Sequence, residues 1–436
     1  MRTEDYKEIL RKYWGYQDFR SIQLDIIQSI GKGRDTLGLM PTGGGKSITF
    51  QVPALAMDGV CLVITPLIAL MKDQVENLRR RHIKAASIHS GMTREQIITT
   101  LENCIFGAIK ILYVSPERLS SRLFLTKLRH VNVSFITVDE AHCITQWGYD
   151  FRPSYLKIAE LRDLLPGKPV LALTATATPA VVEDIQDKLK FSEKNVFKMS
   201  FLRSNLAYIV RNTENRRLEM LHILNKVEGC GIVYTRNRQE TKEIAEYLCN
   251  NGIIATYYHA GLANITKDER QRDWQDDKIR VMVATNAFGM GIDKPDVRIV
   301  IHMEAPDCIE SYYQEAGRAG RDGKTSYAVM LTNRSDIRSL RKRAAADFPE
   351  KDYIRKVYEH IASFFQIAVG SGYGMAFKFN IQKFCRNFKH YPATLEAALR
   401  LLEQAGYIEY DNSEERNSRV MFILKRDELY RLRNNS

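Results

Sequence analysis

The sequence lacks the patterns that are typical of secreted proteins, of proteins with structural zinc sites and of membrane proteins. Its seven cysteines are scattered and no two have C-x-x-C spacing, so we expect neither a disulfide framework nor a zinc knuckle. It shows no N-terminal signal pattern and no apolar run that approaches membrane-spanning length. We therefore expect a protein of the cytoplasm or nucleoid whose cysteines serve packing rather than chemistry.

Positive charge, by contrast, is in excess. With 64 Lys and Arg against 52 Asp and Glu, the formal net charge is +12. Such a balance favours a polyanionic partner, although a well-solvated surface is the alternative. A length of 436 residues is enough for two or three domains, each with a sizeable core.

Short apolar runs alternate with helical patterns in two successive stretches of the chain. The first stretch has expected strands at 36–40, 60–65, 110–114, 135–138 and 170–174, and the second at 231–235, 255–259, 280–285, 298–303 and 326–331. Near-continuous apolar strands separated by helices indicate parallel sheets covered on both faces. We predict two α/β lobes, 1–205 and 206–335, with a ligand held in the cleft between them.

The C-terminal region has a different character. Helical patterns cover 337–346, 353–365 and 381–388, and a further helix carries Leu395, Ala398, Leu399 and Leu402 on one face, with Gly406 as its stop. The stretches 407–410 and 420–424 predict a hairpin. We predict a helical, winged-helix-like accessory region over 336–436, and a small domain that only braces the second lobe is the alternative.

A glycine-rich stretch after the first expected strand indicates a phosphate site. It reads Met40-Pro41-Thr42-Gly43-Gly44-Gly45-Lys46-Ser47, and an apolar helical pattern follows it. The backbone N–H groups of such a loop and the N-terminus of the next helix attract phosphates. We expect Lys46 to reach the terminal phosphates and Ser47 to hold Mg²⁺. The strict form of this motif has glycine where the chain has Met40.

A pair of carboxylates ends another strand of the same lobe, in the stretch Asp139-Glu140-Ala141-His142. Alone, two carboxylates after a strand are usually a turn or a helix cap. Beside a phosphate loop, Asp139 suits a second Mg²⁺ contact and Glu140 can orient and deprotonate an attacking water.

Together these motifs resemble those of superfamily 2 helicases, specifically of the RecQ type. The similarity continues through residues 65–74, 174–178, 284–295 and 312–323. It accounts for Met40, because these helicases do not require the first glycine of the strict motif. The resemblance implies two RecA-like lobes, ATP and Mg²⁺ as cofactors, and 3′-to-5′ movement on single-stranded DNA.

Residues 15–23 are similar to the adenine-reading segment of this family. A glutamine amide offers both a donor and an acceptor to an adenine edge, and an aromatic ring or a guanidinium can stack on the base. We therefore expect Gln23, Tyr16 and Arg20 to contact the adenine. The resemblance also assigns nucleotide contacts to the loop residues Thr42, Gly43, Gly44 and Gly45 and to Asp293.

Arg318 and Arg321 have the spacing of one helical turn, so both could face the nucleotide. We expect them to act as arginine fingers, which are worth about 10³–10⁵ in rate where measured elsewhere. Because they belong to the second lobe, hydrolysis would require lobe closure. Such closure against a bound strand would be translocation.

Residues 145–155 interleave aromatics with Arg and Gly in a polar segment, so we expect exposed rings on which single-stranded nucleic acid can stack, although Trp147 alone could belong to the core. The stretch resembles the aromatic-rich loop that couples DNA binding to ATP hydrolysis in RecQ enzymes. Trp147, Phe151 and Arg152 carry over directly, whereas Tyr149 stands where family members often have His. Further positions that match the strand path are Thr65, Arg118 and Thr285.

The main departure from the family follows the second lobe. RecQ proteins commonly place a four-cysteine zinc module there, but only Cys385 occurs beyond Cys308. A zinc site needs about four ligands, so we predict no zinc site.

The sequence as a whole predicts an ATP-dependent DNA helicase of repair and recombination. We expect a monomer that acts on single-stranded and on forked or junction DNA, without a membrane partner. An RNA helicase, or a translocase that does not separate strands, is the alternative enzyme, because either would hydrolyse ATP with the same motifs. A DNA-binding module with a decayed nucleotide site is the alternative from another class.

Overall fold

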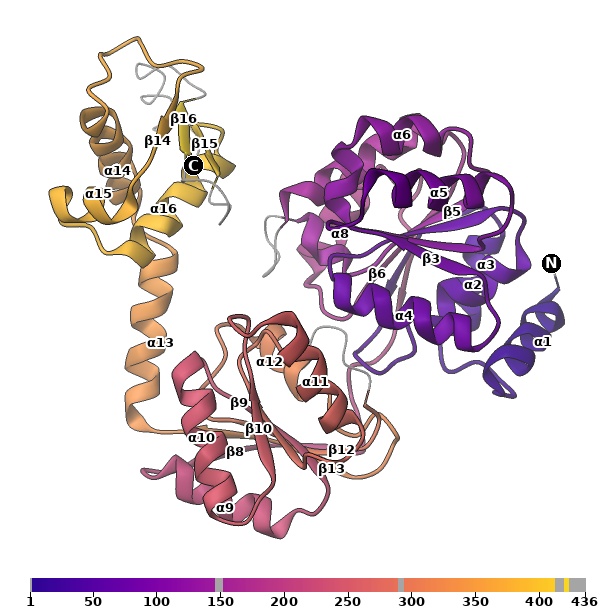
Figure 1. Cartoon of the computed structure of the whole chain (residues 1–436), viewed down its shortest axis with the longest axis horizontal. Helices are drawn as coiled ribbons and strands as arrows, with labels where there is room; N and C mark the ends of the chain where they lie inside the picture. The colour runs from indigo at the N-terminus through magenta and orange to yellow at the C-terminus, as the bar shows by residue number, and fades with distance from the viewer. Residues whose placement is uncertain (1, 146–151, 289–293, 412–418, 423–436) are drawn as a thin grey trace. The chain divides into compact units, whose positions relative to one another are not determined.

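The computed structural model describes residues 2–145, 152–288, 294–411 and 419–422. The chain forms two compact units, Met1–Asn333 and Arg334–Ser436. The first unit contains two parallel sheets with their helices, and the second contains a helical group with a small antiparallel sheet (Figure 1).

The first sheet has seven parallel strands in the order β3-β4-β2-β5-β6-β1-β7. Its strands are β1 (Thr36–Leu39), β2 (Val60–Ile64), β3 (Ala85–Ile88), β4 (Ile111–Val114), β5 (Val133–Val138), β6 (Val170–Thr174) and β7 (Val196–Lys198). The α-helices of this lobe are α1 (Thr3–Trp14), α2 (Gln23–Gly31), α3 (Ile48–Ala56), α4 (Ile68–Arg80), α5 (Arg94–Ile105), α6 (Arg122–Leu128), α7 (Leu161–Leu164) and α8 (Pro179–Lys188). Three 3₁₀ helices, Pro116–Ser120, Ala141–Ile144 and Pro153–Glu160, complete it.

Both faces of this sheet are covered by core. Along β2, Leu62 and Ile64 belong to one apolar cluster, whereas Cys61 and Val63 belong to another. Successive residues of a strand point to opposite faces, so a strand buried on both sides reads as a continuous apolar run. This is why the sequence pattern located most of these strands.

The second sheet has six parallel strands in the order β10-β11-β9-β12-β13-β8. They are β8 (Leu206–Asn212), β9 (Cys230–Tyr234), β10 (Ala255–Tyr258), β11 (Val281–Ala284), β12 (Val297–His302) and β13 (Ser326–Thr332). The helices are α9 (Arg216–Lys226), α10 (Arg238–Asn250), α11 (Asn264–Gln275) and α12 (Ile309–Ala316).

The predicted class of two parallel-sheet α/β lobes is confirmed by these two sheets. Each strand that the sequence predicted in the lobes is present, while β3, β7 and β8 were not predicted. The domain limits 1–205, 206–335 and 336–436 stay a proposal. In the described ranges, no helix has both the length and the apolarity needed to cross a bilayer.

In the part of the second unit that the structure describes, four helices are combined with three antiparallel strands in the order β14-β16-β15. Its elements are α13 (Arg334–Asp347), α14 (Lys351–Phe364), β14 (Ala376–Lys378), α15 (Ile381–Phe388), α16 (Pro392–Gln404), β15 (Ile408–Asp411) and β16 (Arg419–Phe422). Leu395, Ala398, Leu399 and Leu402 of α16 lie in its apolar core, as their spacing predicted. The winged-helix-like character of this region stays a prediction.

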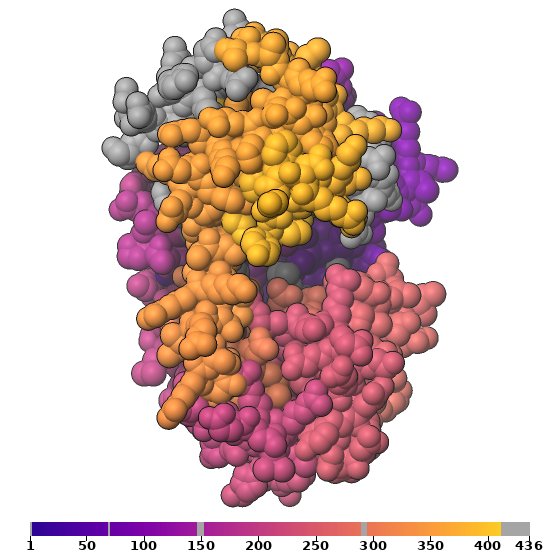
Figure 2. All heavy atoms as spheres, turned by 90° about the vertical axis from the view of Figure 1, so that its left-hand side faces the viewer, coloured from indigo at the N-terminus to yellow at the C-terminus, as the bar shows by residue number. Residues whose placement is uncertain are grey.

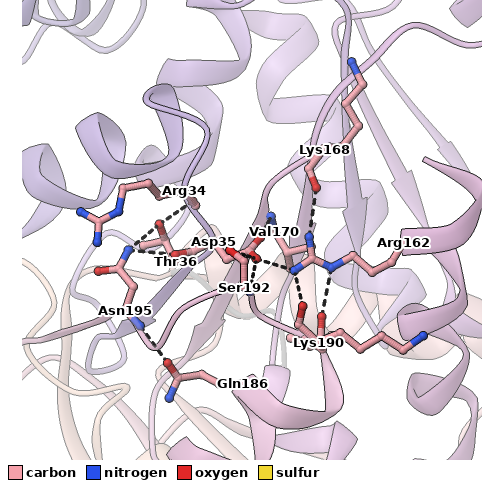
Figure 3. A network of polar contacts seen from close by, with 11 residues as sticks. Arg34, Asp35, Thr36, Arg162, Lys168, Val170, Gln186, Lys190, Ser192 and Asn195 are labelled. Carbon is pink, nitrogen blue, oxygen red and sulfur yellow. Dashed lines mark hydrogen bonds and ion pairs between the residues drawn. The ribbon is translucent and has the colours of Figure 1, made fainter. Parts of the chain in front are cut away.

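A polar network joins the amino-terminal ends of β1 and β6 in the first sheet (Figure 3). The carboxylate of the buried Asp35 accepts hydrogen bonds from Nη2 of Arg162 at 2.6 Å and from the backbone N–H groups of Val170 at 2.9 Å and Ser192 at 3.0 Å. The side-chain amide of Asn195 donates to the carbonyl oxygen of Asp35 at 2.8 Å. These contacts fix β1, which leads into the phosphate loop, against β6.

Candidate nucleotide site

The glycine-rich loop runs from β1 to α3, and Ser47 is the N-cap residue of that helix. Gly43 and Gly45 have φ angles of +81° and +76°, in the left-handed region that favours glycine. Gly45 is also constrained by space, because a Cβ built there would lie 2.3 Å from Nε2 of Gln23. At these two positions the loop therefore has a backbone conformation that depends on glycine.

Gln23, at the start of α2, is hydrogen-bonded to this loop. Its Nε2 donates to the carbonyl oxygen of Gly45 at 3.0 Å, and its Oε1 accepts from the backbone N–H of Arg20 at 2.8 Å. Tyr16 is half exposed, and Cζ of Arg20 lies 5.8 Å from the centre of its ring. The adenine contacts of these three residues stay predictions, and the loop-positioning bonds of Gln23 are an addition that the sequence did not indicate.

Asp139 and Glu140 lie where β5 ends, beside the phosphate loop. Nζ of Lys46 is 3.7 Å from Oε1 of Glu140. Glu140 has φ 48° and ψ 48°, a left-handed conformation that is uncommon outside glycine and that clusters at functional sites. Asp139 accepts hydrogen bonds from the backbone N–H of Glu140 at 3.0 Å and from the hydroxyl of Thr65 at 3.4 Å. Burial first, and then the charge of Glu140, raise the pKa of Asp139 to about 6.

Three further side chains support this carboxylate pair. Nδ1 of His142 lies 2.9 Å from the hydroxyl oxygen of Thr174 and 3.5 Å from Oε2 of Glu140. The hydroxyl of Tyr155 donates to the carbonyl oxygen of Asp139 at 2.9 Å. Tyr155 is completely buried, so the expectation that the aromatics of residues 145–155 are exposed is wrong at this position.

Arg318 and Arg321 lie in a turn that follows α12. That helix ends at Ala316, and Gly320 has a φ of +63°, which a right-handed helix does not allow. The expectation that the two arginines are a helical turn apart is therefore wrong. Arg318 is 4 % exposed. Arg321 lies against the phosphate loop, since a Cβ built on Gly43 would come 3.2 Å from its Cγ.

The segment before β8 holds this turn. Nη1 of Arg203 donates to the carbonyl oxygen of Gly317 at 2.9 Å, and the side-chain amide of Asn205 donates to that of Gly320 at 2.7 Å. Sequence reasoning missed both residues. No local pattern could have found them, because each bond joins residues more than a hundred positions apart.

The residues around the loop fit a triphosphate with Mg²⁺. The hydroxyl of Thr42 is buried with no hydrogen-bond partner in the structure. The Ser47 hydroxyl and the Asp139 carboxylate are hard oxygen donors of the kind that Mg²⁺ prefers. Among the described residues, no group of three or more His, Cys, Asp or Glu could hold a metal ion, and the lack of a zinc module stays a prediction.

Comparison with known proteins assigns the family. The model of the DEAD/DEAH box helicase family matches residues 20–185, and that of the helicase conserved C-terminal domain matches residues 213–323. The probable ATP-dependent DNA helicase RecS of Bacillus subtilis (strain 168) is 41% identical over 336 residues, which are 76% of this chain and 67% of that protein. The chain belongs to the RecQ-type superfamily 2 helicases.

A second relative in this RecQ-type family is the ATP-dependent DNA helicase RecQ of Bacillus subtilis (strain 168), which is 44% identical over 361 residues. The match covers 81% of this chain and 61% of that protein, so the chain spans only part of its relative. The crystal structure of the helicase MrfA bound to DNA has a TM-score of 0.64 at 18% identity, and it covers 98% of this chain and 63% of that one. A likeness at that identity supports the fold alone.

Several of the residues that the RecQ resemblance assigned fall outside the described ranges. They are Trp147 and Phe151 of the aromatic-rich stretch and Asp293 of the nucleotide set, and Tyr149, which departs from the family pattern, lies outside these ranges as well. Their roles stay predictions.

The remaining DNA candidates are described. Nη1 of Arg152 donates to the carbonyl oxygen of Pro66 at 3.4 Å, directly after Thr65. Nη2 of Arg118 donates to the carbonyl oxygen of His89 at 2.6 Å. Thr65 and Thr285 are both buried. These contacts fasten loops at the carboxyl ends of strands, where ligands of parallel sheets bind, and the DNA contacts themselves stay predictions.

Proposed function

We propose that this RecQ-type chain is an ATP-dependent DNA helicase that moves 3′ to 5′ along single-stranded DNA. The observation that carries the proposal is the contact of Arg321 with the phosphate loop at Gly43. Arg321 of the second lobe thereby reaches the loop that carries Lys46, whose Nζ lies 3.7 Å from Oε1 of Glu140 in the first lobe. Hydrolysis that needs both lobes would couple ATP turnover to their relative motion.

Each group has a distinct part in this proposal. Lys46 would bind the terminal phosphates, and Ser47 with Asp139 would hold Mg²⁺, which neutralises phosphate charge when bound. Glu140 would orient the attacking water and accept its proton, a task for which Lys46 and His142 position its two oxygens. Arg318 and Arg321 would stabilise the charge that develops on the leaving phosphates.

The DNA strand would follow the loops at the carboxyl ends of the strands, near Thr65, Arg118, Arg152 and Thr285. Trp147 and Phe151 would offer stacking surfaces to bases. We further propose that the enzyme is a monomer that acts on forked or junction DNA in repair and recombination, in the cytoplasm or at the nucleoid. The names of the curated relatives, ATP-dependent DNA helicases, support the substrate class.

Two measurements test the proposal. ATPase rates with and without single-stranded DNA should differ by an order of magnitude or more in the wild type and be near zero in Lys46→Ala. Strand separation should then be followed on DNA duplexes with a 3′ or a 5′ tail and on the matching RNA duplexes. We expect unwinding of the 3′-tailed DNA alone.

Other outcomes would replace the proposal. Unwinding of RNA but not DNA would make the protein an RNA helicase, and DNA-stimulated ATPase without strand separation would make it a translocase. An ATPase rate that DNA does not change would point to a DNA-binding module with a decayed nucleotide site.

A further inference from the structure

Two buried side chains of the second lobe have no part in the nucleotide site as described above. His302 is the last residue of β12, and Glu315 lies in the last turn of α12. Nε2 of His302 is 2.9 Å from Oε2 of Glu315. Both residues are buried within the lobe, whose outer atoms are pink and salmon in the space-filling view (Figure 2). Burying a carboxylate is costly, so a pair of this kind calls for an explanation.

The bond between the two residues is exclusive. Within the described ranges, no other side chain is hydrogen-bonded or ion-paired to the carboxylate of Glu315. Nδ1 of His302 is likewise buried without a hydrogen-bond partner among those residues. Because a carboxylate oxygen accepts, the ring carries a proton on Nε2. The single hydrogen bond of this imidazole therefore goes to Glu315.

The position of the imidazole is set by a central strand. β12 lies between β9 and β13 in the second sheet, and His302 is in register with Tyr234 at the end of β9. The rings of these two residues stack with centroids 5.3 Å apart, and the centroid of the Tyr312 ring is 5.0 Å from that of His302. A strand paired on both sides and closely packed rings leave the imidazole little freedom, so the direction of its N–H is fixed.

Glu315 leads directly into the turn that carries the two arginines. The backbone N–H of Arg318 donates to the carbonyl oxygen of Glu315 at 3.3 Å. A displacement of Glu315 would therefore move Arg318 with it. The contacts of Arg203 and Asn205 described above hold the rest of the turn, whereas His302 holds its start.

Tyr234 gives the imidazole a second connection to the turn. Its hydroxyl donates to the carbonyl oxygen of Phe288 at 2.8 Å. Burial raises the pKa of Tyr234, and the guanidinium of Arg318 opposes this rise by its charge and by a hydrogen bond. Tyr234 is thus in contact with Arg318 and is stacked on His302 as well.

A histidine suits this place better than a lysine or an arginine would. The charges of Glu315, Arg318 and Arg321 all act on the tyrosine hydroxyl just described, so the three groups lie around one ring. A lysine or arginine bonded to Glu315 would add a third cation there, and like charges this close repel each other. A histidine can donate the same bond from a neutral ring. The carboxylate then keeps its attraction for the two arginines.

We propose that His302 and Glu315 are positioning residues for ATP hydrolysis. Their bond joins the end of α12 to the end of a central strand and thereby places the guanidinium of Arg318 for the transition state. Both residues act through Arg318 rather than on the nucleotide. The proposal rests on the roles proposed above for Arg318 and Arg321 and adds to them the side chains that hold the start of the turn.

The test separates the hydrogen bond from the packing of the ring. His302→Gln keeps an amide N–H at the reach of Nε2, whereas in His302→Asn the same amide is one bond shorter and no longer reaches Glu315. The matched control is Trp274→Phe, which also removes a buried ring N–H from this lobe. Nε1 of Trp274 donates to the carbonyl oxygen of Gly231 at 3.3 Å, near the start of β9. Should His302→Asn fail to fold, His302→Phe, which keeps a ring beside Tyr234, takes its place.

Two readouts follow the chemical step. With saturating single-stranded DNA, we expect His302→Asn to lower kcat by about tenfold with KM for ATP within about twofold of the wild type, since a misplaced catalytic group acts on the transition state. Affinity for ADP with aluminium fluoride, which mimics that transition state, should fall by a similar factor, and affinity for an unhydrolysable ATP analogue should not change. His302→Gln should recover kcat to within about threefold of the wild type. Trp274→Phe should leave both readouts at their wild-type values.

A double variant tests whether His302 acts through Arg318. His302→Asn should lower kcat in the wild type but not in the Arg318→Ala background, because a positioning residue has no effect once the group that it positions is gone. A further drop of the same size in that background would overturn the proposal. So would an unchanged kcat in His302→Asn, or equal losses in His302→Asn and His302→Gln. Failure of the arginine assignment would show separately, as an Arg318→Ala variant whose kcat equals that of the wild type.

Discussion

Nδ1 of His142 lies 2.9 Å from the hydroxyl oxygen of Thr174, so a side chain next to the Asp139–Glu140 carboxylates is bonded to the end of a neighbouring strand. The same nitrogen is 3.5 Å from Oε2 of Glu140. Thr174 therefore positions His142, and His142 in turn limits where Glu140 can point. Glu140 is proposed to orient the attacking water, so this chain of contacts bears on the chemical step rather than on nucleotide affinity.

We predict that Thr174→Val lowers the ATPase kcat by about tenfold while ATP affinity changes less than about twofold, since a bond that orients a catalytic group acts mainly on the chemical step. The matched control is Thr137→Val, which removes a buried hydroxyl from the adjacent strand β5 that lies 3.5 Å from Sγ of Cys61. Steady-state kinetics with saturating single-stranded DNA make the comparison. Equal kcat values in the two variants would remove the positioning role from Thr174.

The turn with the two arginines should depend on the segment before β8. We predict that Arg203→Gln lowers kcat by about tenfold, because it releases the carbonyl oxygen of Gly317 and with it the position of Arg318 and Arg321. Arg211→Gln is the control, since Arg211 is half exposed and pairs with Glu219 on the outside of the same lobe. DNA affinity, measured by anisotropy, should be the same in both. A drop in DNA affinity without a drop in kcat would contradict the assignment.

Gly45 should be intolerant of any side chain. A methyl group there would meet Nε2 of Gln23 and would also strain a φ of +76°. Gly33→Ala is a close control because Gly33 has a φ of +79° with no atom within 4 Å of the added Cβ. Both variants should lose about 1 kcal/mol of stability, but only Gly45→Ala should bind a fluorescent ATP analogue at least tenfold more weakly. Similar nucleotide affinities in Gly45→Ala and Gly33→Ala would show that the side chain of Gln23 moves aside without disturbing the loop.

The network around Asp35 predicts a stability effect that is separate from activity. Burial alone would raise the pKa of Asp35, but hydrogen bonds from Arg162, Ser192 and Val170 together outweigh it and hold the pKa below its usual value. Asp35→Asn should lower the free energy of unfolding of this lobe by about 2–3 kcal/mol. Asp163→Asn, which removes an exposed charge 3.7 Å from Lys190, should change it by less than about 0.5 kcal/mol.

The same pKa sets the pH dependence of this effect. A carboxyl whose folded pKa is depressed contributes its full stability above the unfolded value of about 3.9, and loses it as the pH falls through the folded pKa. The difference between wild type and Asp35→Asn should therefore be constant from pH 5 to pH 7 and shrink below about pH 4. Denaturant unfolding across that range measures it, and a constant difference down to pH 3 would exclude the carboxylate as the cause.

The sequence was a good guide wherever a structural feature is local. The fully buried strands of both sheets read as continuous apolar runs. The glycine-rich loop and the Asp139–Glu140 pair, which the sequence placed at the ends of two strands, lie together in the structure, with Nζ of Lys46 3.7 Å from Oε1 of Glu140. The three strands that were not predicted have little apolar pattern. β3 is the short Ala85–Ile88, β7 has only three residues with alternating exposure, and in β8 Leu206 alone of seven residues is buried.

Contacts between residues far apart in the chain could not be predicted from the sequence. Arg203 and Asn205 hold a turn more than a hundred residues away, and nothing in their own neighbourhood marks them. Tyr155 looked like a stacking aromatic because its neighbours are polar, yet its ring fills the core and its hydroxyl supports Asp139. The turn of Arg318 was taken for a helix because spacing in sequence does not show where Gly320 turns the chain away.

The left-handed backbone conformation of Glu140 has a consequence for the thermal stability of this protein. Asparagine adopts that conformation more readily than glutamate does. Replacing Glu140 by asparagine would thus relieve backbone strain at the same position where it removes the carboxylate that we propose activates water. We expect Glu140→Asn to abolish ATP hydrolysis and to raise the temperature at which the protein unfolds, so that at this residue the wild-type chain gives up stability for activity.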